Sequence, residues 1–204
     1  MPAREKRPFP RDRRVRTIVA KERPEHMKTA ITHAQGMAVH RVPAGDHRWV
    51  SIRPIERSDA AGLSAFYAGL SPESRRRRFL GAVVTVDPAL IAQFVMPDEG
   101  IVGVLREPGR DDGAIVAHAS VQADRSGGAE VAFAVADELQ GRGLGSALVD
   151  AAIRMAGERG FSHASASLYA DNAPMRRLLH DRAREVVSDI IDGGVEEIEL
   201  RLAA

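Results

Sequence analysis

The chain has 204 residues, of which 44% are hydrophobic and 4% aromatic, which predicts one domain with an aliphatic core plus a tail. No apolar run reaches the roughly 18 residues of a membrane span, and no apolar stretch follows the amino-terminal charges, so we expect a cytoplasmic protein without a secretory signal. The chain contains no cysteine, which excludes disulfides, thiolate metal ligands and a cysteine nucleophile.

The net charge of +1 is unevenly distributed. Residues 1–48 contain twelve Lys or Arg against five Asp or Glu, whereas residues 49–204 contain seventeen against twenty-three. All three lysines lie in the first segment, namely Lys6, Lys21 and Lys28. We therefore expect a basic, partly disordered N-terminal extension over 1–48, followed by one domain over 49–204. The role of the extension, and whether Met27 or Met37 is the true start, stay open.

A weak apolar stripe predicts a helix over residues 27–42, ended by Pro43 and Gly45. Four histidines recur every seven residues in this region, namely His26, His33, His40 and His47. The proline and glycine interrupt the face that these histidines would share. We therefore interpret them as part of a solvated segment and predict no metal site.

The domain opens with an alternating strand that begins at Trp49. Ser58 and Asp59 are predicted to cap a helix that runs to Leu70, and a second helix is predicted to begin at Ser71-Pro72. The later elements are expected near 87–95 (helix), 100–106, 114–122 and 129–136 (strands), 146–158 (helix), 161–169 (strand), 173–186 (helix) and 195–202 (strand). Strands followed by alternating helices and strands predict the α/β (α+β) class, with a mixed sheet covered by helices.

A segment between a strand and a helix carries alternating glycines: Gln140-Gly141-Arg142-Gly143-Leu144-Gly145. Because glycine leaves the approach clear, main-chain N–H groups can converge on a ligand, and the amino end of the following helix attracts an anion. The pattern favours phosphate, although a tight turn without a ligand has the same spacing. Three other motifs fit the loop poorly. A nucleoside triphosphate loop requires Gly-Lys-Ser/Thr and a serine hydrolase requires Gly-x-Ser-x-Gly, and the loop has neither. The dinucleotide-binding pattern Gly-x-Gly-x-x-Gly fails because Ser146 stands at its last position.

The glycine loop resembles the Gln/Arg-x-x-Gly-x-Gly/Ala signature of the GNAT N-acetyltransferase superfamily. The resemblance extends from about Val50 to the carboxyl terminus. The strand Ala129–Val135 precedes the loop, and Asn172–Leu178 resembles the asparagine-led helix of the family. Leu70–Phe79 resembles the corresponding segment of bacterial protein lysine acetyltransferases. This resemblance implies a single GNAT-like domain with a largely antiparallel central sheet, and acetyl-CoA as the acetyl-donor cosubstrate.

The same resemblance implies which residues hold acetyl-CoA. The loop amides from Gly141 to Ser146 would bind its pyrophosphate, and the main chain of residues 133–135 would pair with its pantetheine arm. Asn172 would touch the cofactor from the following helix. The implied cofactor-binding residues are Phe133, Ala134, Val135, Gln140, Gly141, Arg142, Gly143, Leu144, Gly145, Ser146 and Asn172. No metal is implied.

The resemblance further implies acetyl transfer to a primary amine, and the lack of cysteine favours direct attack in a ternary complex. Lysine amines are mostly protonated at neutral pH, so a base is needed. Glu130 is the candidate catalytic base, because the family's protein acetyltransferases place a glutamate at the matching position. Alternation puts Glu130 on the face of Ala132 and Ala134, where we expect apolar neighbours to favour its uptake of a proton. An exposed carboxylate paired with arginine is the alternative.

The general acid has no assignment from the sequence. Many GNAT enzymes carry a tyrosine seven residues after the asparagine, and this position is Leu179. The adjacent His180 is interpreted as a surface residue. The terminal Gly-Phe of the family pattern is also absent, since Arg182–Glu185 stands there. Protonation of the departing thiolate, by water for example, is therefore left open.

A protein lysine is favoured as the acceptor over a small-molecule amine because of segment 70–79. A second interpretation is a non-catalytic acetyl-CoA-sensing module whose basic arm binds nucleic acid. Phe9 is the only aromatic residue before Trp49, so the arm serves base stacking poorly. The run Arg75–Arg78 is expected to be a solvated face with one or two buried ion pairs. A homodimer stays open, and lysine self-acetylation would fall within residues 1–28.

Overall fold

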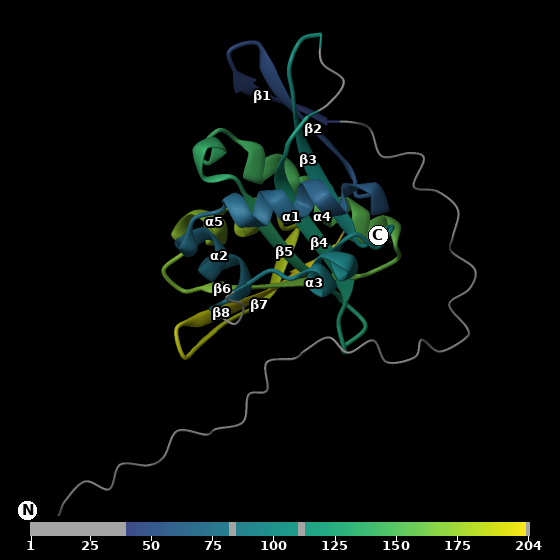
Figure 1. Cartoon of the computed structure of the whole chain (residues 1–204). Helices are drawn as coiled ribbons and strands as arrows, with labels where there is room; N and C mark the ends of the chain where they lie inside the picture. Colours follow the sequence, from purple (N-terminus) through teal and green to yellow (C-terminus); the bar gives the residue numbers. More distant parts are fainter. Residues whose placement is uncertain (1–39, 82–84, 110–112, 203–204) are drawn as a thin grey trace, which may run out of the picture. The chain divides into compact units, whose positions relative to one another are not determined.

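The structure is a computed structural model that describes residues 40–81, 85–109 and 113–202. Within these ranges the strands form one sheet in the order β1-β2-β3-β4-β5-β6-β8-β7 (Figure 1). The strands are β1 (His40–Gly45), β2 (Arg48–Pro54), β3 (Gly100–Arg106), β4 (Ile115–Ala123), β5 (Ala129–Val135), β6 (His163–Tyr169), β7 (Glu185–Asp192) and β8 (Val195–Arg201). The β5–β6 pair is parallel and the other pairs are antiparallel, which confirms the predicted mixed, largely antiparallel sheet.

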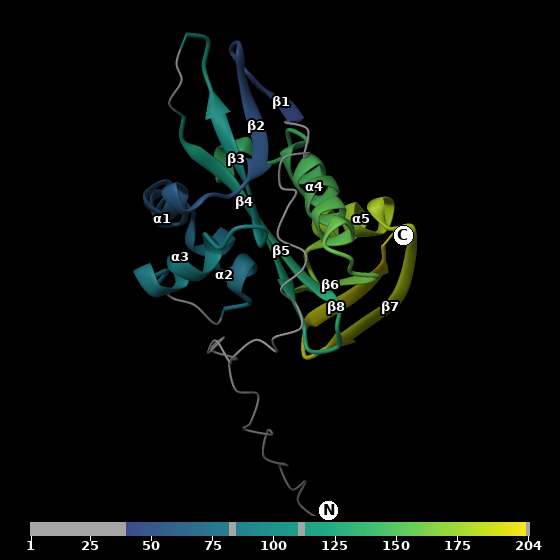
Figure 2. The same cartoon turned by 90° about the vertical axis from the view of Figure 1, so that its right-hand side faces the viewer.

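Helices cover both faces of the sheet (Figure 2). One face carries η3 (Arg57–Asp59), α1 (Ala60–Gly69), α2 (Pro72–Phe79) and α3 (Pro88–Phe94), and the other carries α4 (Leu144–Glu158) and α5 (Ala173–Arg182). A short turn of 3-10 helix, η4 (Asp137–Leu139), precedes the glycine loop. No helix in the described ranges combines the length and apolar character needed to span a membrane.

Three helices begin in the same way, with a polar cap followed by proline in the first turn. The Ser74 amide donates to Ser71 Oγ at 3.1 Å, and the Leu90 amide donates to Asp87 Oδ1 at 2.8 Å. At the start of α5 the Met175 amide donates to Asn172 Oδ1 at 3.4 Å. Each side chain satisfies an amide that the helix leaves free, and proline has no amide to satisfy.

Helix α4 packs on the sheet through the apolar stripe that its sequence predicts. Its buried side chains include Leu148, Val149, Ala152, Met155 and Ala156, whereas Ile153 is only partly buried. Full burial of a leucine or methionine contributes about 1.5–3 kcal/mol. This packing fixes the position of the amino end of α4, which faces the glycine loop.

The predicted helix over 27–42 is wrong at its carboxyl end, where residues from His40 onward form β1; residues 27–39 lie outside the described ranges. Val42 pairs with Val50 of β2, so the sheet begins within the predicted extension 1–48. The turn Gly45-Asp46-His47 has φ angles of 83°, 51° and 61°, which reverse the chain between the two strands. The strand predicted at Trp49 is confirmed as part of β2.

The predicted helix over 173–186 is wrong beyond Arg182, because residues 185–192 form the edge strand β7. This strand is rich in β-branched residues, which favour extended chain over helix. Gly193 and Gly194, with φ angles of 58° and 82°, form the hairpin turn to β8. A pair of glycines between two β-branched runs is a hairpin signal that could have revealed this strand in the sequence.

Candidate active site

The sheet opens between its two parallel strands. Strands β5 and β6 pair only at Ala129↔Ala164 and Glu130↔Ser165, although β5 continues to Val135 and β6 to Tyr169. A cavity of about 760 Å³ is lined by residues 131–135 on one side of this gap and 166–168 on the other. The gap therefore offers a ligand the free edge of a strand.

The antiparallel ladder with β4 shows which main-chain groups of β5 remain free. The Ala136 amide donates to the Val116 carbonyl at 2.8 Å, and hydrogen-bonded pairs recur at every second residue. Ala134, which lies opposite His118, therefore directs its main chain toward β4. Phe133 and Val135 direct theirs into the gap. The Val135 carbonyl accepts from Gln140 at 3.1 Å, so the Phe133 main chain and the Val135 amide remain for pairing with a ligand, and Ala134 contributes its side chain to the cavity.

The glycine loop closes the wide end of this cavity. Gly141 and Gly143 have φ angles of 74° and 82°, a conformation that favours glycine. A Cβ atom at either glycine would meet no atom within 4 Å and would project into open space. No side chain caps the amino end of α4, so its first amides stay available to an anion.

Most of the predicted cofactor-binding residues line the cavity: Phe133, Ala134, Val135, Gln140, Gly141, Gly143, Gly145, Ser146 and Asn172. Two of them do not. The Arg142 guanidinium donates to the Ala44 carbonyl at 3.1 Å, and Leu144 is buried in the core. These two support the loop, and only their main chain remains available to a ligand.

A hydrogen-bond cluster that the sequence does not reveal joins the glycine loop to α2. Asp137 accepts from the Ser71 amide at 2.9 Å and from the hydroxyls of Ser71 and Ser74 at 2.8 and 2.6 Å. Gln140 donates to Ser74 Oγ at 3.3 Å and to the Val135 carbonyl at 3.1 Å. Partial burial acts to raise the pKa of Asp137, but the hydrogen bonds from Ser71 and Ser74 outweigh it and lower the pKa.

A cation stands beside the amino end of α4. Arg182, in the last turn of α5, donates to Ser146 Oγ and pairs with Asp150 at 2.9 Å. Arg182 occupies the position where the sequence departs from the family's terminal Gly-Phe. The departure therefore places an arginine, paired with Asp150, beside Ser146, one of the cavity residues.

The candidate base Glu130 lies at the closed end of the gap, as the last β5 residue paired with β6. Its side chain is exposed, so the predicted enclosure by apolar neighbours is wrong. The predicted alternative of an arginine partner is not found either, since no cation in the described ranges pairs with it. Glu130 does not line the cavity itself, so contact with a substrate there would run through a water or a small side-chain movement.

The described part of the cavity wall contains no tyrosine, histidine or cysteine. Leu179, at the position of the family tyrosine, is fully buried and contributes only apolar surface. His180 does not line the cavity; it is exposed and hydrogen-bonds Asp189 at 3.1 Å, as expected for a surface residue. Glu73 and Asp137 also line the wall, but both carboxyls have pKa values below their usual range, so the described side chains supply no general acid there at neutral pH.

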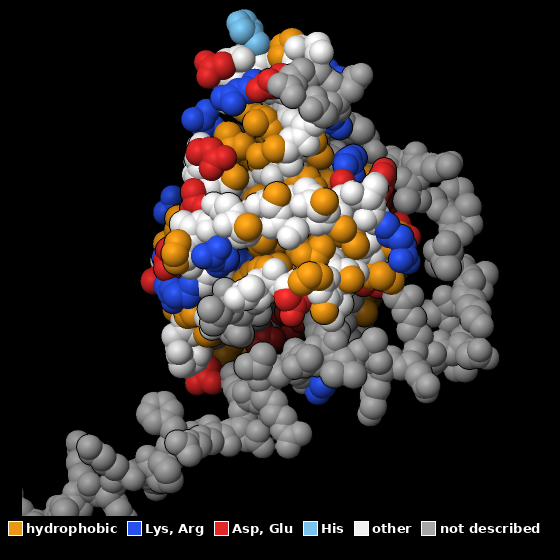
Figure 3. Space-filling view, viewed as in Figure 1, with side chains coloured by type: hydrophobic (Ala, Val, Ile, Leu, Met, Phe, Trp, Pro, Cys, Tyr) orange, Lys and Arg blue, Asp and Glu red, His pale blue; other side chains and the backbone are white. Residues whose placement is uncertain are grey.

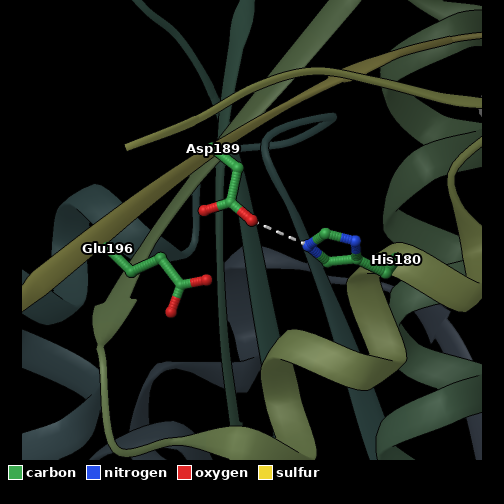
Figure 4. Close-up of side chains that lie close together, drawn as sticks. All are labelled: His180, Asp189 and Glu196. Atoms are coloured by element: carbon green, nitrogen blue, oxygen red, sulfur yellow. Dashed lines mark hydrogen bonds and ion pairs between the residues drawn. The ribbon is translucent and has the colours of Figure 1, made fainter. Parts of the chain in front are cut away.

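A second group of polar side chains lies between α5 and the strands β7 and β8 (Figure 4). His180, Asp189 and Glu196 come from α5, β7 and β8, and their ligand atoms lie within 4.8 Å of one another (Figure 4). Arg176 donates through Nε to both Glu196 oxygens, at 2.6 and 2.7 Å, which neutralises the buried carboxylate. The cluster is thus accounted for by an ion pair and a histidine–aspartate pair.

Beneath the cavity, α2 inserts one arginine into a buried aromatic cluster. Arg78 donates to Ser120 Oγ at 3.0 Å, and its guanidinium carbon lies 5.0 Å from the Phe79 ring centroid and 5.3 Å from that of Phe94. The Tyr67 hydroxyl lies 2.8 Å from His118 Nδ1, and both residues are fully buried. Burial lowers the pKa of His118 well below its usual value, and the Arg78 charge lowers it further.

The buried imidazole of His118 makes stability depend on pH. It stays neutral in the folded chain, whereas in the unfolded chain it takes up a proton below about pH 6.5. The free energy of unfolding should therefore fall as pH drops below about 6.5, by up to ~1.4 kcal/mol per pH unit from this residue. Urea unfolding between about pH 7 and pH 5 measures the slope.

The H118Q variant should lose this part of the slope, while H163Q, which changes a half-buried histidine on β6, should keep it. NMR of the folded protein gives a second reading, in which the His118 ring should not titrate in this range. Equal slopes in H118Q and the unchanged protein would contradict the prediction.

Comparisons with known proteins identify the family. The profile described as the acetyltransferase (GNAT) family matches residues 70–182, which span the cavity from α2 to α5. An acetyltransferase of Pseudomonas aeruginosa is 31% identical over 137 residues, covering 65% of this chain and 73% of that protein.

Solved structures agree with the family profile. The GNAT domain of S. lividans PAT superimposes with a TM-score of 0.64 and 27% identity, covering 76% of this chain and 91% of that one. The Salmonella typhimurium protein yncA, solved with its cofactor acetyl-CoA, shares the fold at a TM-score of 0.55 and 21% identity, over 76% of this chain and 94% of that one. With the glycine loop, the split sheet and these matches together, the chain belongs to the GNAT family of acetyltransferases, enzymes that take an acetyl group from acetyl-CoA.

Proposed function

We propose that this chain transfers the acetyl group of acetyl-CoA to a lysine side chain of a protein, by direct attack of the amine while both substrates are bound. The observation that carries the proposal is the free edge of β5, which lines the cavity and ends at the glycine loop. Acetyl-CoA supplies an acetyl group activated as a thioester.

The cavity fits this cosubstrate on three counts. The pyrophosphate suits the loop of Gly141 and Gly143, where a Cβ would occupy the open space, and the uncapped amides of α4. The amide-bearing pantetheine arm suits the free main chain of Phe133 and the free amide of Val135, which would pair with it as with an added strand. Asn172 lines the cavity at the amino end of α5.

In this proposal Glu130 removes the proton that the acceptor amine must lose. A lysine amine in water has a pKa near 10.4, so at neutral pH most of it is unreactive ammonium. A positioned base typically contributes about 10²–10⁴-fold to the rate. The exposed Glu130 carboxylate can act through a water and return its proton to solvent.

The sheet face that carries Glu130 favours a positively charged acceptor. Glu130 and Glu199 share one face of the sheet on either side of Ser165, and Glu197 lies two residues before Glu199 on the same face. No cation in the described ranges pairs with these three carboxylates. The face lies on the side of α1–α3, and Figure 3 shows acidic side chains in the hollow beneath these helices. Since Ser167 of this face also lines the cavity, a lysine-bearing segment could reach both.

The test uses synthetic lysine peptides whose flanking residues are either basic or neutral. In the double variant E197Q/E199Q, KM for the basic peptide should rise about tenfold while kcat stays unchanged, because each exposed contact contributes about 0.2–1 kcal/mol. The neutral peptide should not respond. E158Q, which removes an exposed carboxylate at the end of α4, serves as the control.

The outcomes separate the parts of the proposal. Calorimetric titration with acetyl-CoA, desulfo-CoA and ATP reports the cosubstrate without any acceptor. If the enzyme acetylates small amines but none of the lysine peptides, the proposed lysine acceptor is wrong. Salt-dependent binding of DNA without turnover of any amine would instead favour a sensing module.

A further inference from the structure

We propose that Arg78 is a catalytic residue whose positive charge stabilises the thiolate that departs when the acetyl group is transferred. This inference rests on the proposed function, since it concerns the thioester of acetyl-CoA. Leu179 stands where many GNAT enzymes carry a tyrosine, and the described cavity wall offers no acid in its place. The positive charge of Arg78 would assist the departing sulfur instead.

Arg78 is held rigidly in the cavity wall. Its guanidinium donates to Ser120 Oγ at 3.0 Å and lies over the rings of Phe79 and Phe94. Ser120 on β4 lies directly opposite Ala132 on β5, and both Arg78 and Ala132 line the cavity. Contacts from α2, α3 and β4 thus leave this side chain little freedom.

The charge of Arg78 is not neutralised by a carboxylate. Its neighbours in the arginine run differ, because Arg76 and Arg77 both bond Glu73, at 2.8 and 2.6 Å. Among residues 40–81, 85–109 and 113–202 no carboxylate pairs with Arg78. Its partners are a hydroxyl and aromatic rings, and the nearby His118 is neutral because burial lowers its pKa. A cation with only neutral partners at a cavity wall can act on charge that develops in the cavity.

The Arg78 guanidinium also lies at the position along β5 where we expect the thioester. The glycine loop lies beyond the carboxyl end of β5, and the free edge runs back from Val135 to Val131, where β5 rejoins β6. An extended arm that starts at the loop and follows this edge ends near Ala132. This is the level at which Ser120 holds the guanidinium.

The chemical step balances with these groups. The amine nitrogen forms a bond to the acetyl carbon, and the carbon–sulfur bond breaks with its electron pair left on sulfur. The proton lost by the nitrogen passes to Glu130 or a water, and the sulfur leaves as a thiolate. An adjacent positive charge lowers the free energy of that thiolate and hence the barrier to its departure.

The test measures the CoA thiol itself. Because the protein has no cysteine, thiolate absorbance in the complex with CoA comes from the ligand alone. The thiol pKa of bound CoA should lie about one unit below that of free CoA, as expected for a cation several ångströms away. R78Q should remove this shift while Kd for CoA changes less than about threefold, and R78K should keep part of the shift.

A matched control and two contrary results complete the experiment. R75Q, which removes a cation of the same helix that does not line the cavity, should leave the thiol pKa unchanged. A bound thiol in the unchanged protein whose pKa is no lower than that of free CoA would overturn the inference, and this reading needs no variant. A shift that persists in R78Q would overturn it as well. Failure of CoA to bind at all would count against the proposed function instead.

Discussion

G143V should abolish acetyl-CoA binding, raising Kd by about 100-fold or more. Gly143 has a φ of 82°, which a β-branched residue rarely adopts, and its missing Cβ faces open space on the ligand side of the loop. The added side chain would stand where the pyrophosphate is expected and would push it away from the amides of α4. An overpacked contact costs about 1–3 kcal/mol, and the displaced amides add to that. Calorimetric titration measures the loss.

G160V is the matched control for this variant. Gly160 has a φ of 83° and a Cβ there would also meet no atom within 4 Å, but it lies after the carboxyl end of α4. Backbone strain is thus nearly equal in the two variants, and only G143V should lose acetyl-CoA. If G143V binds as tightly as G160V, the loop is a turn without a role in binding.

E130Q should lower turnover about 100-fold and leave the Kd of acetyl-CoA unchanged. Glutamine keeps the size and hydrogen-bonding capacity of the side chain but cannot accept the proton of the amine. The loss of a positioned base accounts for this size of effect. The deficit should shrink at high pH, where more of the acceptor is already a free amine.

E199Q provides the comparison, since Glu199 lies on the same face as Glu130 with Ser165 between them. E199Q should raise KM for a basic acceptor and leave kcat unchanged. Full turnover of E130Q across the pH range would assign the proton to bulk water or to another group.

The sequence predicted the parts of the fold that depend on local signals. The cap at Ser71 with its following proline, the apolar stripe of α4 and the glycine loop are each readable over a few residues. Strand β7 was missed because its β-branched residues follow directly on a helical pattern and Ala183 alone ends the helix in extended conformation. The Gly193-Gly194 turn indicates a hairpin, but β8, the strand that pairs with β7, follows this turn in the sequence.

The candidate site was predictable where it is built from one loop and one strand. Most of the residues expected to hold the cofactor line the cavity. Contacts between distant segments were not predictable: Asp137 binds Ser71, 66 residues away, and Arg78 reaches Ser120, 42 residues away. A run of four arginines has no single face, so the sequence could not show that Arg78 alone turns inward.

The narrow junction between β5 and β6 also bears on the stability of the whole sheet. Strands β1–β5 and β6–β8 are joined in the ladder by two residue pairs only. A ligand lying along the free edge would bridge the halves and act as an interior strand of the folded state. By mass action, a ligand at 100 times its Kd adds about 2.7 kcal/mol to the free energy of unfolding. The concentration of acetyl-CoA around the protein would then contribute to how strongly the folded enzyme resists unfolding, in addition to supplying the acetyl group.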